Sequence, residues 1–160
     1  MPVYLFTFHA YRSWMPDRKR GFVRRHEGLL PPDPKLAAKY RERAAHDEVE
    51  FDDAQSWAMI AETAKLCGEI DLHLHEVAVV ASHIHTLVSW RSELKSLQVA
   101  ARLKQRQGRA LSVLLNRPGP WFSRGRSRKR VRNREHFDRL MKSYLPNHGR
   151  IRYTLWDGRN

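Results

Sequence analysis

The chain lacks most of what an exported or membrane-embedded protein needs. Cys67 is the only cysteine among 160 residues, which excludes an intramolecular disulfide and every zinc site built from several thiolates. No apolar stretch approaches the roughly 20 residues of a membrane-spanning helix. Residues 1–10 lack a basic segment followed by an apolar run, so we expect no signal peptide. These absences predict a cytoplasmic protein with no membrane partner.

Acidic residues are scarce relative to basic ones. The chain has 30 Lys and Arg against 17 Asp and Glu, which gives a formal net charge of +13. Such an excess favours a polyanionic partner, because each neutralised phosphate releases condensed counterions. A basic protein bound to a membrane surface is the weaker alternative, since no stretch combines a clean apolar helix face with a basic one. An apolar fraction of 41% is enough for one packed core in one domain.

Periodicities of two and of 3.6 residues alternate along the chain and predict an α+β protein. Asp52 or Asp53 can cap the first long helix, and Gly68 suits its end. The predicted elements in chain order are a strand at 3–9, a helix from 52 or 53 to about 67, strands at 71–80 and 83–90, a helix at about 93–115, a strand or ribbon at 121–132, and a last helix that begins at Asn133 and carries Tyr144.

The order of these elements predicts a ferredoxin-like, RRM-like sandwich, in which helices pack on a central and mostly antiparallel sheet. We expect a single domain over 1–160. Within it, residues 12–51 are predicted to be a loop and insertion, because 12–26 are basic and three prolines follow at 31, 32 and 34. A short polar helix is expected at 34–46.

His83-Ile84-His85 is the sharpest local motif. On a strand both imidazoles point to one face, about 7 Å apart along the strand, where they could chelate one divalent metal. The alternative is two surface histidines in a hairpin. His73-Leu74-His75 has the same spacing, but a turn at 81–82 would place His75 roughly 10 Å from His85. We therefore expect a polar strand face there and not a four-histidine zinc site.

Tyr144 and His148 lie four residues apart on the predicted last helix. Residues at this spacing share a helix face, so a phenol and an imidazole could reach one centre. Pro146 removes a backbone donor and is expected to distort the last turn. Alternatively, Tyr144 is an aromatic residue of the core.

Nine positions in the stretch 124–132 hold six cations, which indicates a nucleic-acid face or a solvated charge run. Trp14, like Tyr11 and Trp121, could stack unpaired bases or pack at the core. The residues predicted to contact DNA are Arg12, Trp14, Lys104, Arg124, Arg126, Arg128, Lys129, Arg130 and Arg132.

In its His83-Ile84-His85 motif followed by Tyr144, the chain resembles the HUH single-tyrosine transposases, where HUH denotes histidine, hydrophobic residue, histidine. It is most similar to the insertion-sequence-200-like and REP-associated tyrosine transposases. The opening residues 6–11, the Pro31-Pro32-Asp33-Pro34 stretch, the 121–132 segment and Tyr144-Leu145-Pro146-Asn147-His148 also resemble family segments.

Two positions depart from the family pattern. The polar residue four positions after the tyrosine is usually Gln, Asn or Glu, and here it is His148. The residue before the first histidine tends to be Asn, and here it is Ser82.

The resemblance implies a metal-dependent enzyme with the His-x-His motif on a central strand. His83, His85 and His148 would hold Mg²⁺ or Mn²⁺, which acts as a Lewis acid on the scissile phosphate. Tyr144 would attack phosphorus, giving a 5′-phosphotyrosine and a free 3′-hydroxyl without a nucleotide cofactor. The implied partner is single-stranded DNA, with hairpins that carry unpaired flanks as the substrate. The family contains both monomers and homodimers.

Three other functions are compatible with parts of the sequence. A catalytically inactive module on the same fold could bind single-stranded DNA or RNA hairpins through the basic surface alone. A basic RNA-binding protein of ribosomal type would carry the charge but fits five tryptophans less well. A zinc hydrolase lacks the helical His-Glu-x-x-His pair.

Overall fold

The computed structural model describes residues 1–24 and 26–154. Five strands form one antiparallel sheet in the order β6-β1-β5-β4-β7, with β5 at its centre. The bounds are β1 (Val3–His9), β4 (Leu72–Val80), β5 (His83–Trp90), β6 (Ser127–Arg130) and β7 (Ile151–Thr154). The predicted α+β fold, with helices on an antiparallel sheet and the His-x-His motif on a central strand, is confirmed.

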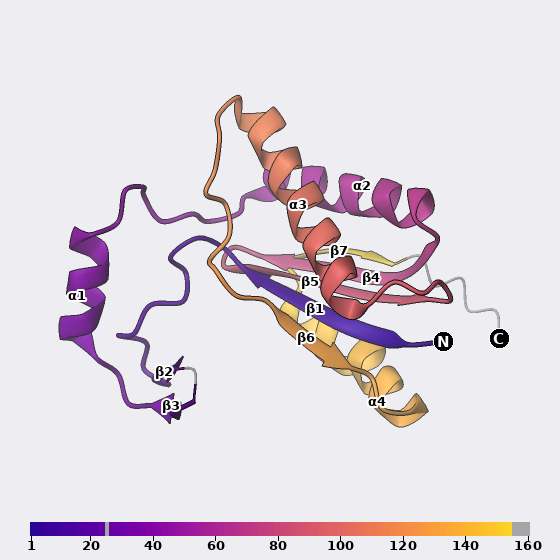
Figure 1. Ribbon diagram of the computed structural model, residues 1–160, viewed down its shortest axis with the longest axis horizontal. Coiled ribbons are helices and arrows are strands. Elements are labelled where there is room, and N and C mark those ends of the chain that lie inside the picture. Colours follow the sequence, from indigo (N-terminus) through magenta and orange to yellow (C-terminus); the bar gives the residue numbers. More distant parts are fainter. Residues whose placement is uncertain (25, 155–160) are drawn as a thin grey trace.

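Two long helices, α2 (Asp53–Glu69) and α3 (Ser96–Leu115), cover one face of the sheet (Figure 1). The path β1-α2-β4-β5-α3-β6 is the β-α-β-β-α-β order of the ferredoxin-like sandwich. Asp52 caps α2 as predicted, because its side chain accepts from the Gln55 backbone N–H and the Gln55 side chain accepts in return from Asp52 N–H.

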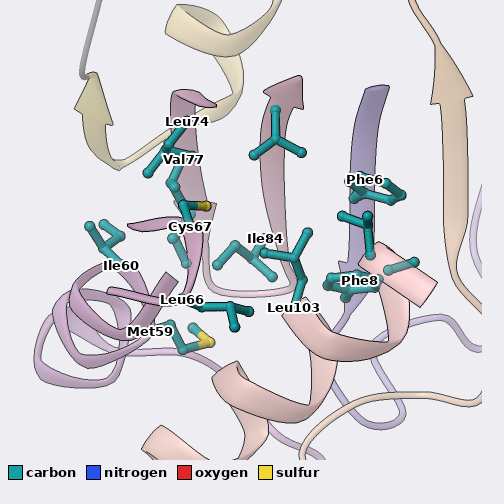
Figure 2. Packing of buried hydrophobic residues seen from close by; sticks show 14 of the residues in the cluster. Phe6, Phe8, Met59, Ile60, Leu66, Cys67, Leu74, Val77, Ile84 and Leu103 are labelled. Carbon is teal, nitrogen blue, oxygen red and sulfur yellow. The ribbon is translucent and has the colours of Figure 1, made fainter. Parts of the chain in front are cut away.

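The main core lies between this face and the two helices (Figure 2). Strand alternation sends Phe6 and Phe8 of β1 and Ile84 of β5 into it, where they are fully buried. Met59 of α2 and Leu103 of α3 meet them from the helix side. The periodicities that predicted these elements therefore also define the buried face.

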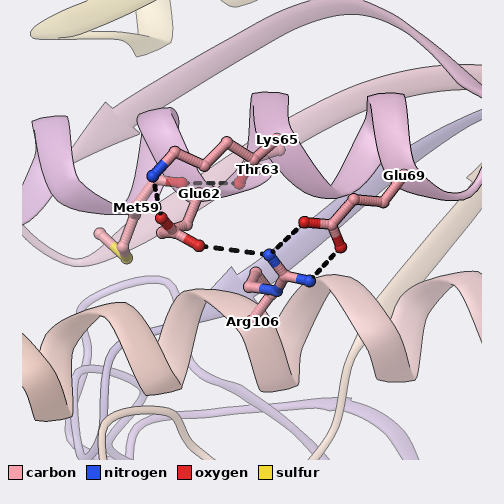
Figure 3. A network of polar contacts seen from close by, with 6 residues as sticks. All are labelled: Met59, Glu62, Thr63, Lys65, Glu69 and Arg106. Carbon is pink, nitrogen blue, oxygen red and sulfur yellow. Dashed lines mark hydrogen bonds and ion pairs between the residues drawn. The ribbon is translucent and has the colours of Figure 1, made fainter.

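Polar contacts hold α2 and α3 in register above the core. Arg106 of α3 pairs with Glu62 and Glu69 of α2, and Lys65 also pairs with Glu62 (Figure 3). Deeper in the structure, the buried Gln107 amide donates to Thr63 Oγ1 at 3.0 Å. These bonds fix the helices relative to each other.

The opposite face of the sheet carries the last helical segment. It consists of α4 (Arg134–Arg139), the π-helical turn η1 (Leu140–Tyr144) and the short α5 (Leu145–His148). Asn133 caps α4 as predicted, with its side chain accepting from His136 N–H. Leu140 and Leu145 pack onto this face in a second, smaller core.

The insertion between β1 and α2 contains more regular structure than predicted. It holds a small hairpin of β2 (Phe22–Arg24) and β3 (Gly28–Leu30), followed by α1 (Pro34–Glu42), which ends four residues before its predicted limit. This part stands to one side of the sheet (Figure 1). Gly21 is essential to the hairpin, since its φ is 76° and an added Cβ would lie 1.9 Å from Leu30 O.

The structure differs from the sequence-based expectations at two places near the C-terminus. The strand expected at 121–132 is confined to Ser127–Arg130, because Trp121 instead turns into the core and donates from its indole to Ser112 Oγ at 2.8 Å. Strand β7 was not predicted, since four residues are too few for a clear alternation. Across the described residues, no helix is long and apolar enough to cross a bilayer.

Strand β7 is fastened to β4 by a buried carboxylate. Glu76 is fully buried, and Arg152 Nε donates to its Oε1 at 2.7 Å. A buried charge that loses its partner is strongly destabilising. Gly149 leaves room for the Arg152 side chain beside the backbone, because an added Cβ at Gly149 would lie 2.5 Å from that side chain.

We expect Arg152→Met to lower the free energy of unfolding by about 3 kcal/mol, because it leaves the Glu76 charge buried without a cation. The double variant Glu76→Leu/Arg152→Met should recover most of this loss. Urea unfolding measures both effects. Arg150→Met is the matched control, since its ion pair with Asp53 is exposed and should contribute little. Equal urea midpoints for Arg152→Met and Arg150→Met would contradict the assignment.

Candidate functional site

The site lies on the sheet face that carries the last helical segment. His83 and His85 of β5 both point to this face, and Ile84 points to the main core, as the alternation predicted. Their ring centroids are 4.7 Å apart. In the register with β1, Thr7 lies opposite His85 and His9 lies opposite His83.

The three predicted ligand histidines each have their Nδ1 engaged in a hydrogen bond. His85 Nδ1 lies 2.8 Å from Thr7 Oγ1, and His83 Nδ1 lies 2.9 Å from Ser82 Oγ. His148 Nδ1 donates to the Tyr144 carbonyl at 2.8 Å. Metal-binding imidazoles are held in this way, with one nitrogen fixed by an outer partner and the other left for the ion.

The remaining nitrogen of His85 is a buried donor or acceptor that the described residues leave without a hydrogen bond. Buried polar atoms are rarely left unpaired, so His85 Nε2 calls for a ligand or a water molecule. Ser82, at the position where the resemblance leads one to expect Asn, orients His83 through its hydrogen bond to His83 Nδ1.

Burial keeps the two strand histidines neutral. It lowers the pKa of His83 to about 4, with further lowering from His9, His148 and Arg18. It lowers the pKa of His85 to about 3, with His83 as the next cause. Ligation requires neutral imidazole, so both rings are ready to bind a cation at pH 7.

Tyr144 and His148 approach this pair from the helical segment. Their rings stack at 4.1 Å, and the Tyr144 ring centroid is 5.4 Å from that of His85. The His148 ring is 6.0 Å from His85. The structure therefore brings the Tyr144 and His148 rings together beside His85, and their sharing of one metal centre stays a prediction.

The π turn explains how the segment sits on the sheet. Leu145 N–H bonds Leu140 O, five residues back, so both leucines face the sheet although an α-helix would separate them by about 140°. Pro146 follows at once and has no N–H, which fits the predicted distortion of this turn. Tyr144, between the two leucines, is thereby held over His85.

The histidine side chains that could ligate a metal do not form a complete metal site in this structure. Within 1–24 and 26–154, no group of three His, Cys, Asp or Glu side chains is arranged to hold a metal ion. The His83–His85 pair fits a cation as a two-nitrogen chelate, while the third ligand is not in position. Imidazole ligands favour transition metals over Mg²⁺, which keeps its water ligands.

His9 is the site residue that sequence reasoning missed. Its ring centroid lies 5.4 Å from that of His83 and 4.6 Å from that of Trp14. Alternation within 3–9 places His9 on the same face as Thr7, but only the pairing of β1 with β5, which is distant in sequence, brings it to the site.

Among the predicted stacking residues, Trp14 and Trp121 have different environments. Trp14 is 41% exposed beside His9, and the Arg18 guanidinium lies 4.0 Å from its ring centroid. Trp121 is buried in the core. Of the two, Trp14 is therefore the exposed ring, and it lies beside His9.

Strand alternation divides the basic run between two faces. Lys129 lies opposite Leu5 and shares the histidine face, where its charge contributes to lowering the pKa of His85. Arg128 lies opposite Phe6 and turns to the other side, where it bonds Ser96 Oγ at 3.0 Å. All six predicted cations are exposed: Arg124, Arg126, Arg128, Lys129, Arg130 and Arg132.

Arg12 and Lys104 are engaged within the protein. Arg12 donates to His46 O at 3.0 Å, and Lys104 donates to Ser123 O at 2.6 Å and to Gly125 O at 2.9 Å. The Lys104 bonds tie α3 to the loop that precedes β6 and so position the basic run. Direct contact of either residue with DNA stays a prediction.

Comparison with known proteins gives a likeness of fold. No protein-family model matches the chain, and no curated protein sequence matches it. The ferredoxin-like arrangement does match solved structures. One is a REP-associated tyrosine transposase bound to a REP hairpin, with a TM-score of 0.52 over 94% of this chain and 70% of that chain, at 10% sequence identity.

The neutral histidines make a pH dependence testable. We expect the metal-free protein to lose stability as the pH falls from about 6.5 toward 4. His75, His83 and His85 have folded pKa values of about 4, 4 and 3 against 6.5 when unfolded, so the unfolded chain takes up protons first. Their contribution is complete above pH 6.5.

Urea unfolding with a chelator present, at a series of pH values, measures this effect. Carboxylates titrate mainly below about pH 5, so a slope between 6.5 and 5 belongs to histidines. His85→Gln should show a shallower slope. A flat stability profile over that window in the unsubstituted protein would contradict the prediction.

Proposed function

We propose that this protein is a single-stranded DNA endonuclease and strand transferase of the transposase type, with Tyr144 as its nucleophile. The observation that carries the proposal is the meeting of Tyr144 with His85 at 5.4 Å between ring centroids, beside His83 on the central strand. The solved transposase that shares this fold is bound to a DNA hairpin, which supports a related partner here.

The reaction is a transfer of phosphorus between oxygens. Tyr144 Oη attacks the scissile phosphorus and loses its proton, while the bond from phosphorus to the 3′-oxygen breaks and that oxygen gains a proton. A 5′-phosphotyrosine and a 3′-hydroxyl result. Attack by a 3′-hydroxyl on the phosphotyrosine reverses the step and joins strands, so no nucleotide cofactor is consumed.

The histidines would hold the metal ion that stabilises the negative charge of the phosphate. A divalent ion held by His83 and His85, with His148 as third ligand, would supply Lewis-acid stabilisation to the phosphate. Of the predicted ions, Mn²⁺ suits imidazole nitrogen better than Mg²⁺. Thr7 and Ser82 fix the orientation of His85 and His83 through their Nδ1 atoms.

His148 serves as a positioning group as well as a ligand. Its Nδ1 is fixed by the Tyr144 carbonyl and its ring stacks on the Tyr144 ring, so each ring limits the orientation of the other. Completing the set of three ligands requires His148 Nε2 to turn toward His85.

The DNA is held by charge and stacking. An unpaired base stacks on Trp14, whose ring lies next to His9 and under Arg18. Lys129 on the histidine face contacts the backbone near the scissile phosphate, and the rest of the basic run binds the hairpin.

Tyr144→Phe should abolish the covalent protein–DNA adduct with little effect on stability, because it removes one oxygen and keeps the ring. The test incubates labelled single-stranded hairpin DNA with protein and Mn²⁺ and resolves adducts by denaturing electrophoresis. Tyr153→Phe is the matched control, since Tyr153 lies on β7 and packs against the main core. Full adduct yield from Tyr144→Phe, with loss in Tyr153→Phe, would overturn the assignment of the nucleophile.

A catalytically inactive hairpin-binding module is the second candidate. It is favoured by the absence, within the described part of the chain, of three preassembled metal ligands. Both candidates bind hairpins after His83→Ala, because affinity comes mainly from phosphate contacts. Only the enzyme forms a metal-dependent adduct that His83→Ala removes. Hairpin binding without any adduct in Mn²⁺ would favour the inactive module.

Replacing Arg124, Arg126 and Lys129 by Gln should flatten the salt dependence of hairpin binding. Each phosphate of a single strand that the variant no longer neutralises lowers the log–log slope by about 0.7. Fluorescence anisotropy over a salt series measures the slope. Lys65→Gln is the control, because Lys65 lies on α2 and pairs with Glu62. An unchanged slope in the triple variant would show that this run is a solvated surface only.

A further inference from the structure

A second histidine pair lies on the same sheet face, at the opposite end from the proposed site. His73 and His75 of β4 were expected to form a polar strand face. A β-bulge between Leu74 and Glu76 changes the alternation there. The two ring centroids are 4.6 Å apart with an interplanar angle of 67°, which is close to the 4.7 Å and 78° of the His83–His85 pair.

His75 has an unmet bonding requirement. The residue is only 8% exposed, and its Nε2 lies 2.9 Å from the buried Ser89 Oγ. Its Nδ1 is buried and makes no hydrogen bond to any described residue. Burial lowers the pKa of His75 to about 4, with His73 as the second cause, so the ring is neutral at pH 7.

A cavity of about 450 Å³ opens beside the pair. Its lining includes Asp71, His73, His75 and Ser89, so a carboxylate and two imidazoles border one space. Along β5, Ser89 lies four residues beyond His85, which is about 13 Å of strand. One ion therefore cannot touch both histidine pairs.

We propose that His73 and His75 bind a second metal ion, of the transition-metal class that imidazole prefers, such as Zn²⁺. No third His, Cys, Asp or Glu ligand is in place in the part of the chain that the structure describes, so water fills the remaining positions. The Ser89 bond holds the His75 ring as outer partners hold metal-binding imidazoles.

The bound ion acts on the helical segment that carries the nucleophile. The His75 ring meets the Phe137 ring edge-on at 5.0 Å between centroids, and Phe137 belongs to α4. An ion that fixes the His75 ring therefore also restrains Phe137 in α4, at the start of the helical segment in which Tyr144 follows. This second site is independent of the proposed reaction, because it needs neither Tyr144 nor the His83–His85 pair.

Zn²⁺ titration of the chelator-stripped full chain by calorimetry tests the proposal. The background is His83→Ala/His85→Ala, which removes the first pair and leaves β4 intact. We expect one Zn²⁺ equivalent to remain, with a rise in melting temperature because the ion binds only the folded state. Adding His73→Ala should weaken that binding at least tenfold. His73 is exposed and makes no side-chain hydrogen bond to a described residue, so its loss leaves the fold intact.

His46→Ala in the same background is the matched control, since His46 is also exposed but lies in the insertion. It should leave Zn²⁺ affinity unchanged. Two outcomes overturn the proposal. If the background variant binds no Zn²⁺, water alone satisfies His75. If binding survives His73→Ala unchanged or is lost with His46→Ala, the ion sits elsewhere. Neither outcome bears on adduct formation by Tyr144, which is measured separately.

Discussion

The site depends on one apolar contact, between the helical segment and the sheet face that does not carry α2 and α3. Leu140 and Leu145 are buried against Leu5, Leu87 and Ala78. Burying a leucine side chain contributes about 1.5–3 kcal/mol. Nothing covalent near the site joins Tyr144 and His148 to the strand histidines, so this contact sets the distance between nucleophile and ligands.

The contact divides one sheet face into zones with different chemistry. Leu87 lies in the middle of β5, with His85 and His83 on one side of it and Ser89 on the other. Alternation gives all four residues the same face. An apolar patch flanked by histidines at both ends therefore arises where β5 runs beside β4. The opposite face of β5 carries Ile84, Thr86 and Val88, which are buried beneath α2 and α3.

Much of this arrangement follows from sequence, since local patterns fix the main elements. The alternation of 83–90 and the turn at 81–82 predicted the hairpin, and the spacing of Tyr144 and His148 predicted that they share a face. Pairing between distant strands has no local signal, which is why His9 was missed. The hairpin β2–β3 and strand β7 have three or four residues per strand, too few for periodicity to register. The π turn was anticipated only as a distortion near Pro146.

The position of β6 at the edge of the sheet affects how readily two molecules of this protein could associate. An edge strand offers unpaired backbone groups to other chains and is a common start of aggregation. Arg128, Lys129 and Arg130 place positive charge on both sides of this edge. Two such edges repel each other, so the strand resists pairing with a second molecule. At the other border, β7 spans only the four residues Ile151–Thr154, and a short edge strand offers few backbone groups for pairing. The charge of β6 that would attract a polyanion thus also opposes edge-to-edge pairing of two molecules along this strand.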